Sequence, residues 1–407
     1  MALVVQKYGG TSVGDTDKIK HVAARVKRTR DEGHDVVVVV SAMAGETNRL
    51  VDLCNQMMEQ PDTRGYDVVV STGEQVTIGL LSLALQNMGQ EAISLMGFQV
   101  AVHTDTVHAK ARIESIDTDR IFQNLKDGRI VVIPGFQGIT KTGDITTLGR
   151  GGSDTSAVAL AAALKADSCE IYTDVEGIYT TDPNVVSDAR KISRISYEEM
   201  LEMASLGAKV LQIRSVEFAK NYNVPLHVRS TFTDTEGTWV TKEDPEMEKV
   251  AVSGVTYDKN EAKVSIMRVP DKPGIAARIF GAIADANINV DMIIQNISID
   301  GFTDLTFTVP KADLAQAIRI VQPIAGEIGA KEVLTDDKVA KVSIVGTGMR
   351  SHSGIASRMF RALAQDGINI MMISTSEIKV SCVIESKYTE LAVRVLHNTF
   401  ELAGESV

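Results

Sequence analysis

Cysteine is scarce in this sequence, which contains three in 407 residues, at Cys54, Cys169 and Cys382. They are odd in number, lie far apart and form no CxxC pair, so neither a disulfide framework nor a zinc site is predicted. Free thiols fit a reducing compartment, and we therefore expect a cytoplasmic protein. The N-terminal segment MALVVQKYGG becomes polar too early for a signal peptide.

Long hydrophobic runs and clusters of basic residues are also missing. Apolar stretches such as AVALAAAL at 157–164 are too short to span a bilayer, so no membrane partner is expected. The net charge is -11 and no block of five like charges occurs, which excludes a nucleic-acid binder that relies on clustered Lys and Arg. The GxxxxGK[ST] pattern of P-loop enzymes is absent. A small anionic ligand is still compatible, because a local pocket can oppose the net charge.

Apolar β-branched segments alternate with helical patterns from residue 1 to about 230. Continuous apolar strands separated by helices predict an α/β fold, with a mainly parallel sheet covered by helices on both faces. In such sheets, ligands bind beyond the carboxyl ends of the strands. The expected strands are 3–8, 35–42, 67–72, 91–97, 130–136, 169–174 and 225–230. The expected helices are 15–32, 74–88, 116–127, 153–165 and 197–220.

The C-terminal part contains an internal repeat. GIAARIFGAIADANINVDMI at 274–293 aligns with GIASRMFRALAQDGINIMMI at 354–373, and each copy follows a segment that begins KVSI. Each copy predicts a ferredoxin-like βαββαβ module, and the second lacks its last strand. We expect 250–257 to supply that strand. The expected domains are a catalytic domain at 1–245, a first module at 263–338, and a discontinuous second module at 250–257 plus 341–407.

The stretch KYGGTSVG at 7–14 follows the first expected strand. Gly9 and Gly10 let the backbone bend and bring its amides close to an anion, while Thr11 and Ser12 suit the N-cap of a helix. Lys7 adds a positive charge. The same residues would also fit an ordinary Gly-rich turn with a solvated lysine. This stretch alone therefore favours a phosphate site only slightly.

Three further motifs strengthen the case for a ligand site at the same sheet edge. SAMAGETN (41–48) ends the second strand, and LGRGGSDTSA (148–157) combines a guanidinium, bare amides and a helix start, which together suit an anion. TDVEGIYTTDP (173–183) suits ribose hydroxyls and an adenine face. Together they predict a site for a phosphate compound and a carboxylate substrate.

These motifs, with STGEQ at 71–75, resemble in order and spacing the aspartate kinases of the amino acid kinase superfamily. The resemblance covers essentially the whole chain, since that family carries two C-terminal ACT modules, and it is closest to the bacterial lysine- and threonine-sensitive type. It implies a three-layer αβα amino acid kinase sandwich followed by two ferredoxin-like ACT modules. The implied reaction is ATP-dependent phosphorylation of the β-carboxylate of L-aspartate to 4-phospho-L-aspartate, the first step towards lysine, threonine, methionine and diaminopimelate.

The resemblance also implies roles for individual residues. The catalytic residues are Lys7, Arg150 and Asp154, with Asp154 orienting Lys7 and the phosphate-bound Mg²⁺. Aspartate is held by Thr47, Glu74, Arg150, Gly151, Gly152 and Ser153, with Glu74 suited to the ammonium group. The nucleotide is held by Lys7, Tyr8, Gly9, Gly10, Ser12, Ser41, Asp154, Thr173, Asp174, Tyr179, Asp182, Pro183, Asn184 and Lys209. Magnesium arrives with ATP, bound by phosphates and water rather than by a set of protein side chains.

Ordinary structural roles compete with several of these assignments. Glu74 and Thr47 also fit helix starts, Asp182 with Pro183 fits a common turn, and Lys209 fits a solvated helix position. His103 and His108 flank Asp105, but their spacing matches no standard metal site, so structural roles are expected.

The modules are implied to bind regulatory amino acids, with lysine and threonine as the expected effectors. The first module would use Asp271, Ile275, Ala276, Asn289, Val290, Asp291 and Gln295. The second would use Ile355, Ala356, Asn369, Ile370, Ser374 and Thr375. Asp271 and Asp291 have no acidic counterpart in the second copy, so the two sites are expected to differ in ligand. A purely dimerising role is the alternative, and a homo-oligomer (dimer or tetramer) is expected either way. Met247 precedes the repeat and allows for a regulatory short chain.

Two other functions stay open at this point. Another amino acid kinase would act on glutamate, N-acetylglutamate or a nucleotide, and Glu74 argues for a free ammonium group on the substrate. A catalytically inactive amino-acid sensor is the second alternative. The intact Lys7, Arg150 and Asp154 argue against it.

Overall fold

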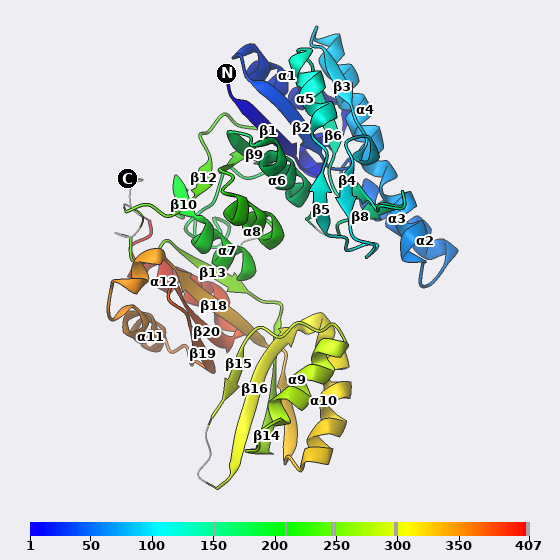
Figure 1. Cartoon of the computed structure of the whole chain (residues 1–407). Helices are drawn as coiled ribbons and strands as arrows, with labels where there is room; N and C mark the ends of the chain where they lie inside the picture. Colours follow the sequence, from blue (N-terminus) through cyan, green and yellow to red (C-terminus); the bar gives the residue numbers. More distant parts are fainter. Residues whose placement is uncertain (150, 208–209, 246, 248–249, 297–299, 404–407) are drawn as a thin grey trace.

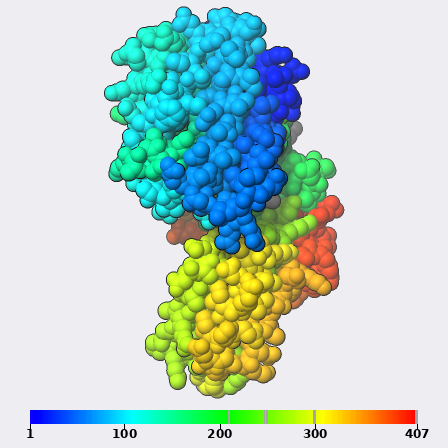
Figure 2. All heavy atoms as spheres, turned by 90° about the vertical axis from the view of Figure 1, so that its right-hand side faces the viewer, coloured from blue at the N-terminus to red at the C-terminus, as the bar shows by residue number. Residues whose placement is uncertain are grey.

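The computed structural model describes residues 1–149, 151–207, 210–245, 247, 250–296 and 300–403. Figure 1 shows an N-terminal αβ part, coloured blue to green, followed by two smaller αβ modules. Figure 2 shows the first of these modules, in yellow, at the end of the molecule opposite the blue and cyan part.

The bounds of the elements are as follows. The strands of the N-terminal part are β1 (Leu3–Tyr8), β2 (Asp35–Val40), β3 (Ala92–Ser94), β4 (Val102–Thr104), β5 (Ile113–Ile116), β6 (Ile130–Pro134), β7 (Gln137–Ile139), β8 (Ile145–Thr147), β9 (Ser168–Thr173), β10 (Arg194–Ser196), β11 (Leu226–Ser230) and β12 (Thr238–Thr241). Its helices are α1 (Thr16–Asp31), α2 (Glu46–Met57), α3 (Thr63–Val70), α4 (Thr72–Asn87), α5 (Asp119–Lys126), α6 (Gly152–Leu164), α7 (Tyr197–Ser205) and α8 (Ile213–Tyr222). The modules contain β13 (Gly254–Asp258), β14 (Glu261–Pro270), α9 (Ile275–Asp285), β15 (Ile293–Gln295), β16 (Phe302–Pro310), α10 (Leu314–Ile328), β17 (Glu332–Asp336), β18 (Val339–Val345), α11 (Ile355–Gln365), β19 (Met372–Thr375), β20 (Lys379–Glu385) and α12 (Thr389–Thr399). Short 3₁₀ turns are η1 (Gly10–Val13), η2 (Gly97–Gln99), η4 (Lys311–Asp313), η5 (Thr347–Arg350) and η6 (Ser386–Tyr388).

The large sheet has eight strands in the order β10-β12-β11-β9-β1-β2-β6-β3. Its described pairings are parallel except that of β11 with β12. Alternate valines of β2 enter different cores: Val36, Val38 and Val40 pack with α1 and α4, whereas Val37 and Val39 pack on the α6 side. The sheet is therefore the middle layer of an αβα sandwich, as the apolar strands predicted.

Two sequence-based assignments in this part are wrong. The expected strand at 67–72 is helix, because Asp67–Val70 ends α3 and Thr72 begins α4. The Asp67 side chain is buried and accepts hydrogen bonds from Thr147 Oγ1 (2.6 Å) and His108 Nδ1 (2.8 Å), so tertiary contacts override the β preference of the valine run. The expected helix at 197–220 is two helices, α7 and α8.

A small sheet in the order β5-β4-β7-β8 was not predicted, because its strands have only three or four residues. The buried Asp67 accepts hydrogen bonds from the backbone of Ala109 and from Thr147 of this sheet, which anchors it to α3. His108 therefore has a structural partner.

The stretch Thr63–Asn87 is long and apolar enough, by length and composition, to cross a membrane. It consists of α3 and α4, half of its most apolar window is buried, and Glu74 lies in its middle. These features are those of core helices, which pass the same test, so the stretch is weak evidence for a membrane span. The expectation that the apolar runs are too short to span a bilayer did not take the stretch Thr63–Asn87 into account.

Each module has a four-stranded sheet, in the orders β15-β16-β14-β17 and β13-β18-β20-β19. The strand expected within 250–257 is β13, and it pairs antiparallel with β18, from Gly254 opposite Val345 to Asp258 opposite Lys341. This strand precedes the first module in sequence but lies in the sheet of the second.

The two modules meet at a buried ion-pair cluster. Lys341 of β18 is 2% exposed, and its Nζ lies 3.2 Å from Glu261 Oε1 and also pairs with Asp291 of the first module. Beside it, Met292 packs with Val339, Met372 and Val383 in one apolar cluster. The charged pairs and the apolar cluster together hold the modules against each other.

Candidate functional site

Lys7 and Asp154 form an ion pair at the carboxyl edge of the large sheet. Lys7 is the penultimate residue of β1, and Asp154 lies in the first turn of α6. Lys7 Nζ is 2.6 Å from Asp154 Oδ1, and the two side chains are only 12% and 10% exposed. A nearly buried ion pair at the end of a strand is costly to build for stability alone, which makes a functional role the better explanation.

The strand ends around this pair carry almost no side-chain atoms. A Cβ on Gly135, just after β6, would lie 2.7 Å from Ser153 Cβ, so the chain passes directly against the start of α6. Gly9 donates its amide to Tyr172 O at 3.4 Å, which places Thr173 beside the bend. The bend at Gly9 and the amino end of α6 therefore lie beside the Lys7 ammonium group, an arrangement that suits phosphate oxygens.

The side chains of Tyr8 and Ser12 do not face this space, which corrects their expected contribution. The Tyr8 ring is fully buried and stacks on Tyr172, with centroids 4.6 Å apart. Ser12 Oγ is also buried and lies 2.6 Å from Thr231 Oγ1. The expected N-cap role of Thr11 or Ser12 is also wrong for α1, which is capped by Asp15.

Glu74 is a buried carboxyl group with an unused oxygen. It lies in the first turn of α4 and is 2% exposed. Oε1 accepts a hydrogen bond from the Ala42 amide at 3.3 Å, whereas Oε2 has no hydrogen-bond partner among the described residues. Burial raises the pKa of Glu74 to about 8. The positive charge of a bound ligand would favour the ionised form of this carboxyl group.

Some of the residues expected to bind the substrate with Glu74 lie close to one another in the structure. The Gly73 position approaches the Ala42 side chain closely, so the start of α4 lies against the 41–48 segment that carries Ser41 and Thr47. Gly152 and Ser153 begin α6, and Gly151 is its N-cap residue. Arg150, expected to hold a carboxylate, lies outside the described residues, as does Lys209.

A cavity of about 890 Å³ lies beyond the end of β9. Burial and the neighbouring Glu176 raise the pKa of Tyr179, one of the residues at its wall. The residues expected to hold the nucleotide that line this cavity are Thr173, Asp174, Tyr179, Asp182, Pro183 and Asn184. The structure thus brings one expected group together in a space of nucleotide size.

The other wall of this cavity comes from a segment that was not predicted to contact the nucleotide. Val255–Asn260, which includes most of β13, lines the same cavity. Its VAVSGVTY pattern indicated a strand but gave no sign of a ligand. Its contact with the cavity depends on pairing with a strand that is distant in the sequence, and a local pattern does not contain that pairing.

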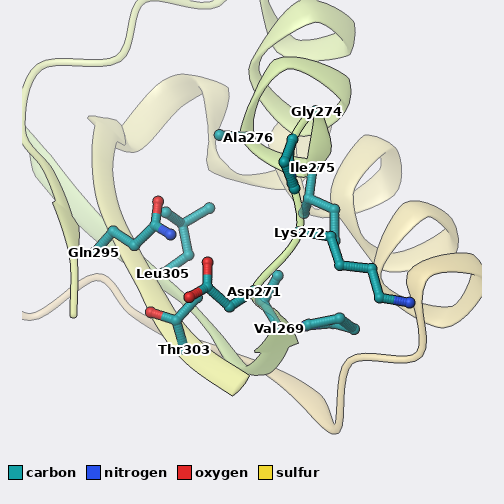
Figure 3. Close-up of a pocket in the computed structure, with 11 residues that line it drawn as sticks. Val269, Asp271, Lys272, Gly274, Ile275, Ala276, Gln295, Thr303 and Leu305 are labelled. Atoms are coloured by element: carbon teal, nitrogen blue, oxygen red, sulfur yellow. The ribbon is translucent and has the colours of Figure 1, made fainter. Parts of the chain in front are cut away.

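A second cavity, of about 330 Å³, lies in the first module at the start of α9. Figure 3 shows the carboxylate of Asp271 and the amide of Gln295 on the same side, whereas Lys272 extends away. Of the expected effector residues, Asp271, Ile275, Ala276 and Gln295 line it, and Thr303 and Leu305 are additions. Asn289 and Val290 are not among its lining residues, and Asp291 instead pairs with Lys341.

The equivalent loop of the second module is engaged by the N-terminal part. Glu199 of α7 is 1% exposed, and its Oε1 accepts hydrogen bonds from Thr347 N (3.0 Å) and Ser253 Oγ (2.5 Å). Arg350 Nη1 lies 3.1 Å from Glu243 Oε2. The loop after β18 therefore connects two parts of the protein, whereas the loop after β14 lines a cavity.

Comparisons with known proteins follow this division of the chain. An amino acid kinase family model matches residues 2–230, and ACT domain models match 264–326 and 342–400. The chain is 60% identical over 403 residues to the aspartate kinase of Stutzerimonas stutzeri, covering 99% of this chain and 98% of the relative. It is 61% identical over 404 residues to the aspartokinase of Pseudomonas aeruginosa, with 99% and 98% coverage.

Solved structures agree with the sequence relatives. E. coli aspartokinase III in complex with aspartate and ADP, described as the R-state, matches with a TM-score of 0.81 at 26% identity, covering 98% of this chain and 99% of that chain. The complex of the same enzyme with lysine and aspartate, described as the T-state, matches with a TM-score of 0.77 at the same identity and coverage.

Proposed function

Because this chain belongs to the aspartate kinases of the amino acid kinase family, we propose that the site around Lys7, Glu74 and Asp154 transfers the γ-phosphoryl group of ATP to the β-carboxylate of L-aspartate. The protein is an aspartate kinase, and its product is 4-phospho-L-aspartate. It catalyses the first step towards lysine, threonine, methionine and diaminopimelate. The observation that carries the site assignment is the Lys7–Asp154 ion pair at 2.6 Å, held at the sheet edge beside the cavity.

The acceptor needs no general base. A β-carboxylate has a reference pKa of about 4 and is already ionised at neutral pH. The chain's own contribution is therefore alignment of the two substrates and neutralisation of charge on the transferring group. Glu74 binds the α-ammonium group of aspartate through its unused oxygen, and Thr47 with the start of α6 contacts the remainder. Arg150 is assigned to a substrate carboxylate.

Lys7 supplies the positive charge at the γ-phosphate. Asp154 holds the Lys7 ammonium group in one position, so that it meets the transferring oxygens without reorganisation. The backbone amide of Gly10 contacts the same phosphate, whereas the Gly9 amide already donates to Tyr172 O and Gly9 leaves the space beside Lys7 free of a side chain. The cavity lined by Thr173–Asn184 accepts the nucleoside, and Lys209 is assigned to the phosphates.

Magnesium is proposed as the companion ion of ATP. The ion arrives on the phosphates of ATP and is held mainly by phosphate and water oxygens. We assign Asp154, in the first turn of α6, to this ion. When bound, Mg²⁺ neutralises negative charge on the phosphate groups.

The activity is tested by trapping the acyl phosphate with hydroxylamine, in the presence of ATP and Mg²⁺. L-aspartate should give the hydroxamate, whereas L-glutamate and N-acetyl-L-aspartate should not, because the first misplaces the carboxylate and the second lacks the ammonium group for Glu74. Turnover of glutamate or of the acetylated compound in preference to L-aspartate would overturn the assignment.

We also propose a division of the chain into a catalytic domain at 1–245, a first ACT module at 263–338 and a second at 250–257 plus 341–407. The pairing of β13 with β18 supports the discontinuous second module. Exposed apolar residues on the edge strands, Ile293 (52%) and Ile373 (43%), support a homo-oligomer formed through the modules. A cytoplasmic location is proposed because the three cysteines are free and buried.

Lysine and threonine are proposed as feedback inhibitors, with the cavity beside Asp271 and Gln295 as the site in the first module. The Asp271 carboxylate suits a ligand ammonium group. Inhibition and thermal shift with lysine, threonine and both together test this assignment, with Asp271→Asn as the variant and Asp313→Asn, on η4 outside the cavity, as its matched control. Loss of the lysine response in the control as well, or in neither variant, would remove the site.

A further inference from the structure

Tyr257 belongs to the second module by strand pairing, yet it lines the cavity proposed for the nucleotide. It lies on β13, opposite Val342 of β18. The cavity is also lined by Asp258, Lys259 and Asn260, and by residues of the Thr173–Asn184 segment. The cavity is thus completed by a residue of the regulatory half of the chain.

Backbone contacts fix β13 against the catalytic domain. Val255 donates its amide to Thr180 O at 2.7 Å, inside the Thr173–Asn184 segment that also lines the cavity. At Gly207 the φ angle is +109°, and any side chain there would collide with the carbonyl oxygen of Tyr257. Glycine at 207 thereby allows the two backbones to touch, and Tyr257 is held at a defined distance from the cavity wall.

The Tyr257 hydroxyl completes the hydrogen bonding of Asp182. Tyr257 Oη donates to Asp182 Oδ2 at 2.9 Å, while Asp182 Oδ1 accepts from the amide (2.9 Å) and side chain (3.0 Å) of Asn184. Both carboxylate oxygens therefore have a donor, and the plane of the carboxylate is fixed. Burial and the Asp182 carboxylate raise the pKa of Tyr257 to about 12, so the hydroxyl remains a donor at physiological pH.

We propose that Tyr257 is a positioning residue for the nucleotide, which orients the Asp182 carboxylate so that its Oδ2 accepts a hydrogen bond from a ribose hydroxyl of ATP. The proposal rests on the proposed function in one respect, namely that the cavity beyond β9 holds the nucleotide. Asp182 Oδ1 already accepts two hydrogen bonds from Asn184, whereas Oδ2 keeps a second acceptor position beside Tyr257 Oη, so a ribose hydroxyl finds a fixed acceptor at Oδ2. Without the phenolic hydroxyl, Asp182 is held on one side only.

The test replaces Tyr257 by Phe, which keeps the ring and removes the hydroxyl. We expect the KM for ATP to rise about five- to tenfold, less than the loss of a direct hydrogen bond to a charged group would give, because the hydroxyl acts through Asp182; kcat and the KM for aspartate should stay within about twofold of the parent values. Tyr222→Phe, at an exposed position at the end of α8, is the matched control and should leave all three constants unchanged.

Two additional measurements separate positioning from a purely structural role. With 2′-deoxy-ATP or 3′-deoxy-ATP, one of the two should show a much smaller difference between Tyr257→Phe and the parent protein. In an Asp182→Asn background, the Tyr257→Phe change should add little, because the oriented carboxylate is already lost. An unchanged KM for ATP, or an equal rise in the KM for aspartate, would refute the proposal.

The outcome is distinguishable from failure of the proposed function. Titration calorimetry with ADP measures nucleotide affinity whether or not aspartate is phosphorylated. Weaker ADP binding by Tyr257→Phe supports the positioning role even if the acceptor proves to be a different acid. Equal ADP affinity of the two proteins would overturn the role, even if aspartate kinase activity is intact.

Discussion

The raised pKa of Glu74 predicts that aspartate binding is coupled to the release of a proton. In the free protein this carboxyl group is 2% exposed, and burial raises its pKa from 4.5 to about 8. At pH 7 only about one-tenth of the molecules carry an ionised Glu74, and at pH 6 about one-hundredth. If the ammonium group of aspartate pairs with the ionised form, binding at pH 7 should release about 0.9 proton per site.

The same coupling sets the pH dependence of aspartate affinity. Between pH 6 and 7 the affinity should rise about tenfold, and it should level off above pH 8, where Glu74 is ionised before the ligand arrives. The β-carboxylate of the ligand stays ionised throughout this range, with a reference pKa of about 4. The rise therefore reports the titration of the enzyme.

Stability of the ligand-free protein should change in the opposite direction. Folded Glu74 keeps its proton up to about pH 8, whereas the unfolded chain loses it near 4.5, so unfolding releases a proton between these values. The contribution of Glu74 to stability is complete below pH 4.5 and is lost as the pH rises to about 8. Since each pH unit is worth about 1.4 kcal/mol, the total is on the order of 5 kcal/mol.

Titration calorimetry at pH 7, in two buffers of different ionisation enthalpy, measures the proton release directly. Glu74→Gln is the matched variant, because it keeps the shape of the side chain and removes the titration. It should bind aspartate weakly with no proton release attributable to this site, and any remaining pH dependence then belongs to the ligand. Equal proton release by the parent protein and by Glu74→Gln, or none by either, would refute the reasoning.

Three other predictions follow from buried charges. Lys7→Ala should lower kcat about 10²- to 10³-fold while aspartate binding by calorimetry changes little, and the exposed Lys20→Ala should match the parent protein. Lys341→Met should lower the free energy of urea unfolding by about 3 kcal/mol, because Glu261 stays buried without its cation. The double variant that also carries Glu261→Met should recover most of this loss. A double variant as unstable as Lys341→Met would contradict the explanation. Glu199→Gln should cost about 2 kcal/mol in the same assay, because an amide cannot accept all the donors around this buried carboxylate, and an unchanged midpoint would show that the cluster contributes nothing.

The central sheet could be predicted because its signal is local. β1, β2 and β6 are continuous apolar runs whose side chains are buried on both faces, and their expected bounds agree with the structure to within two residues. The run Asp67–Val70 carries a similar composition but forms helix. There the Asp67 carboxylate meets Thr147 and His108, contacts that no window of sequence around residue 67 contains.

The candidate site also contains residues that the local sequence predicted and residues whose position depends on distant contacts. Lys7 and Asp154 were predicted from motifs at strand ends, and the ion pair between them brings the two motifs together. The side chains of Tyr8 and Ser12 turn into the core, which the motif could not reveal because a strand or turn residue has two possible faces. Tyr257 was missed because its partner Asp182 lies 75 residues away and the two meet only after β13 joins the second module.

The repeat in the sequence suggests two equal modules, but their surroundings make them different. In the first, the loop after β14 and the start of α9 leave a cavity of about 330 Å³. In the second, the matching loop is bonded to the buried Glu199 of the catalytic domain through Thr347. A ligand that entered the second site by the same route would have to compete with this bond, whereas the first site is open.

The different surroundings of the two modules also separate the cavity that can hold a ligand from the contacts that lead towards the N-terminal part. Asp291 shortly precedes Gln295, a residue of the first-module cavity, and pairs with Lys341 on β18, whose neighbouring strand β13 carries Tyr257 to the cavity proposed for the nucleotide. Contacts alone do not establish energetic coupling, which requires a ligand to bind two arrangements with different affinity. The contacts that we expect two such arrangements to change are those of the Lys341 cluster between the modules, and those of Glu199 and Tyr257 between the second module and the N-terminal part.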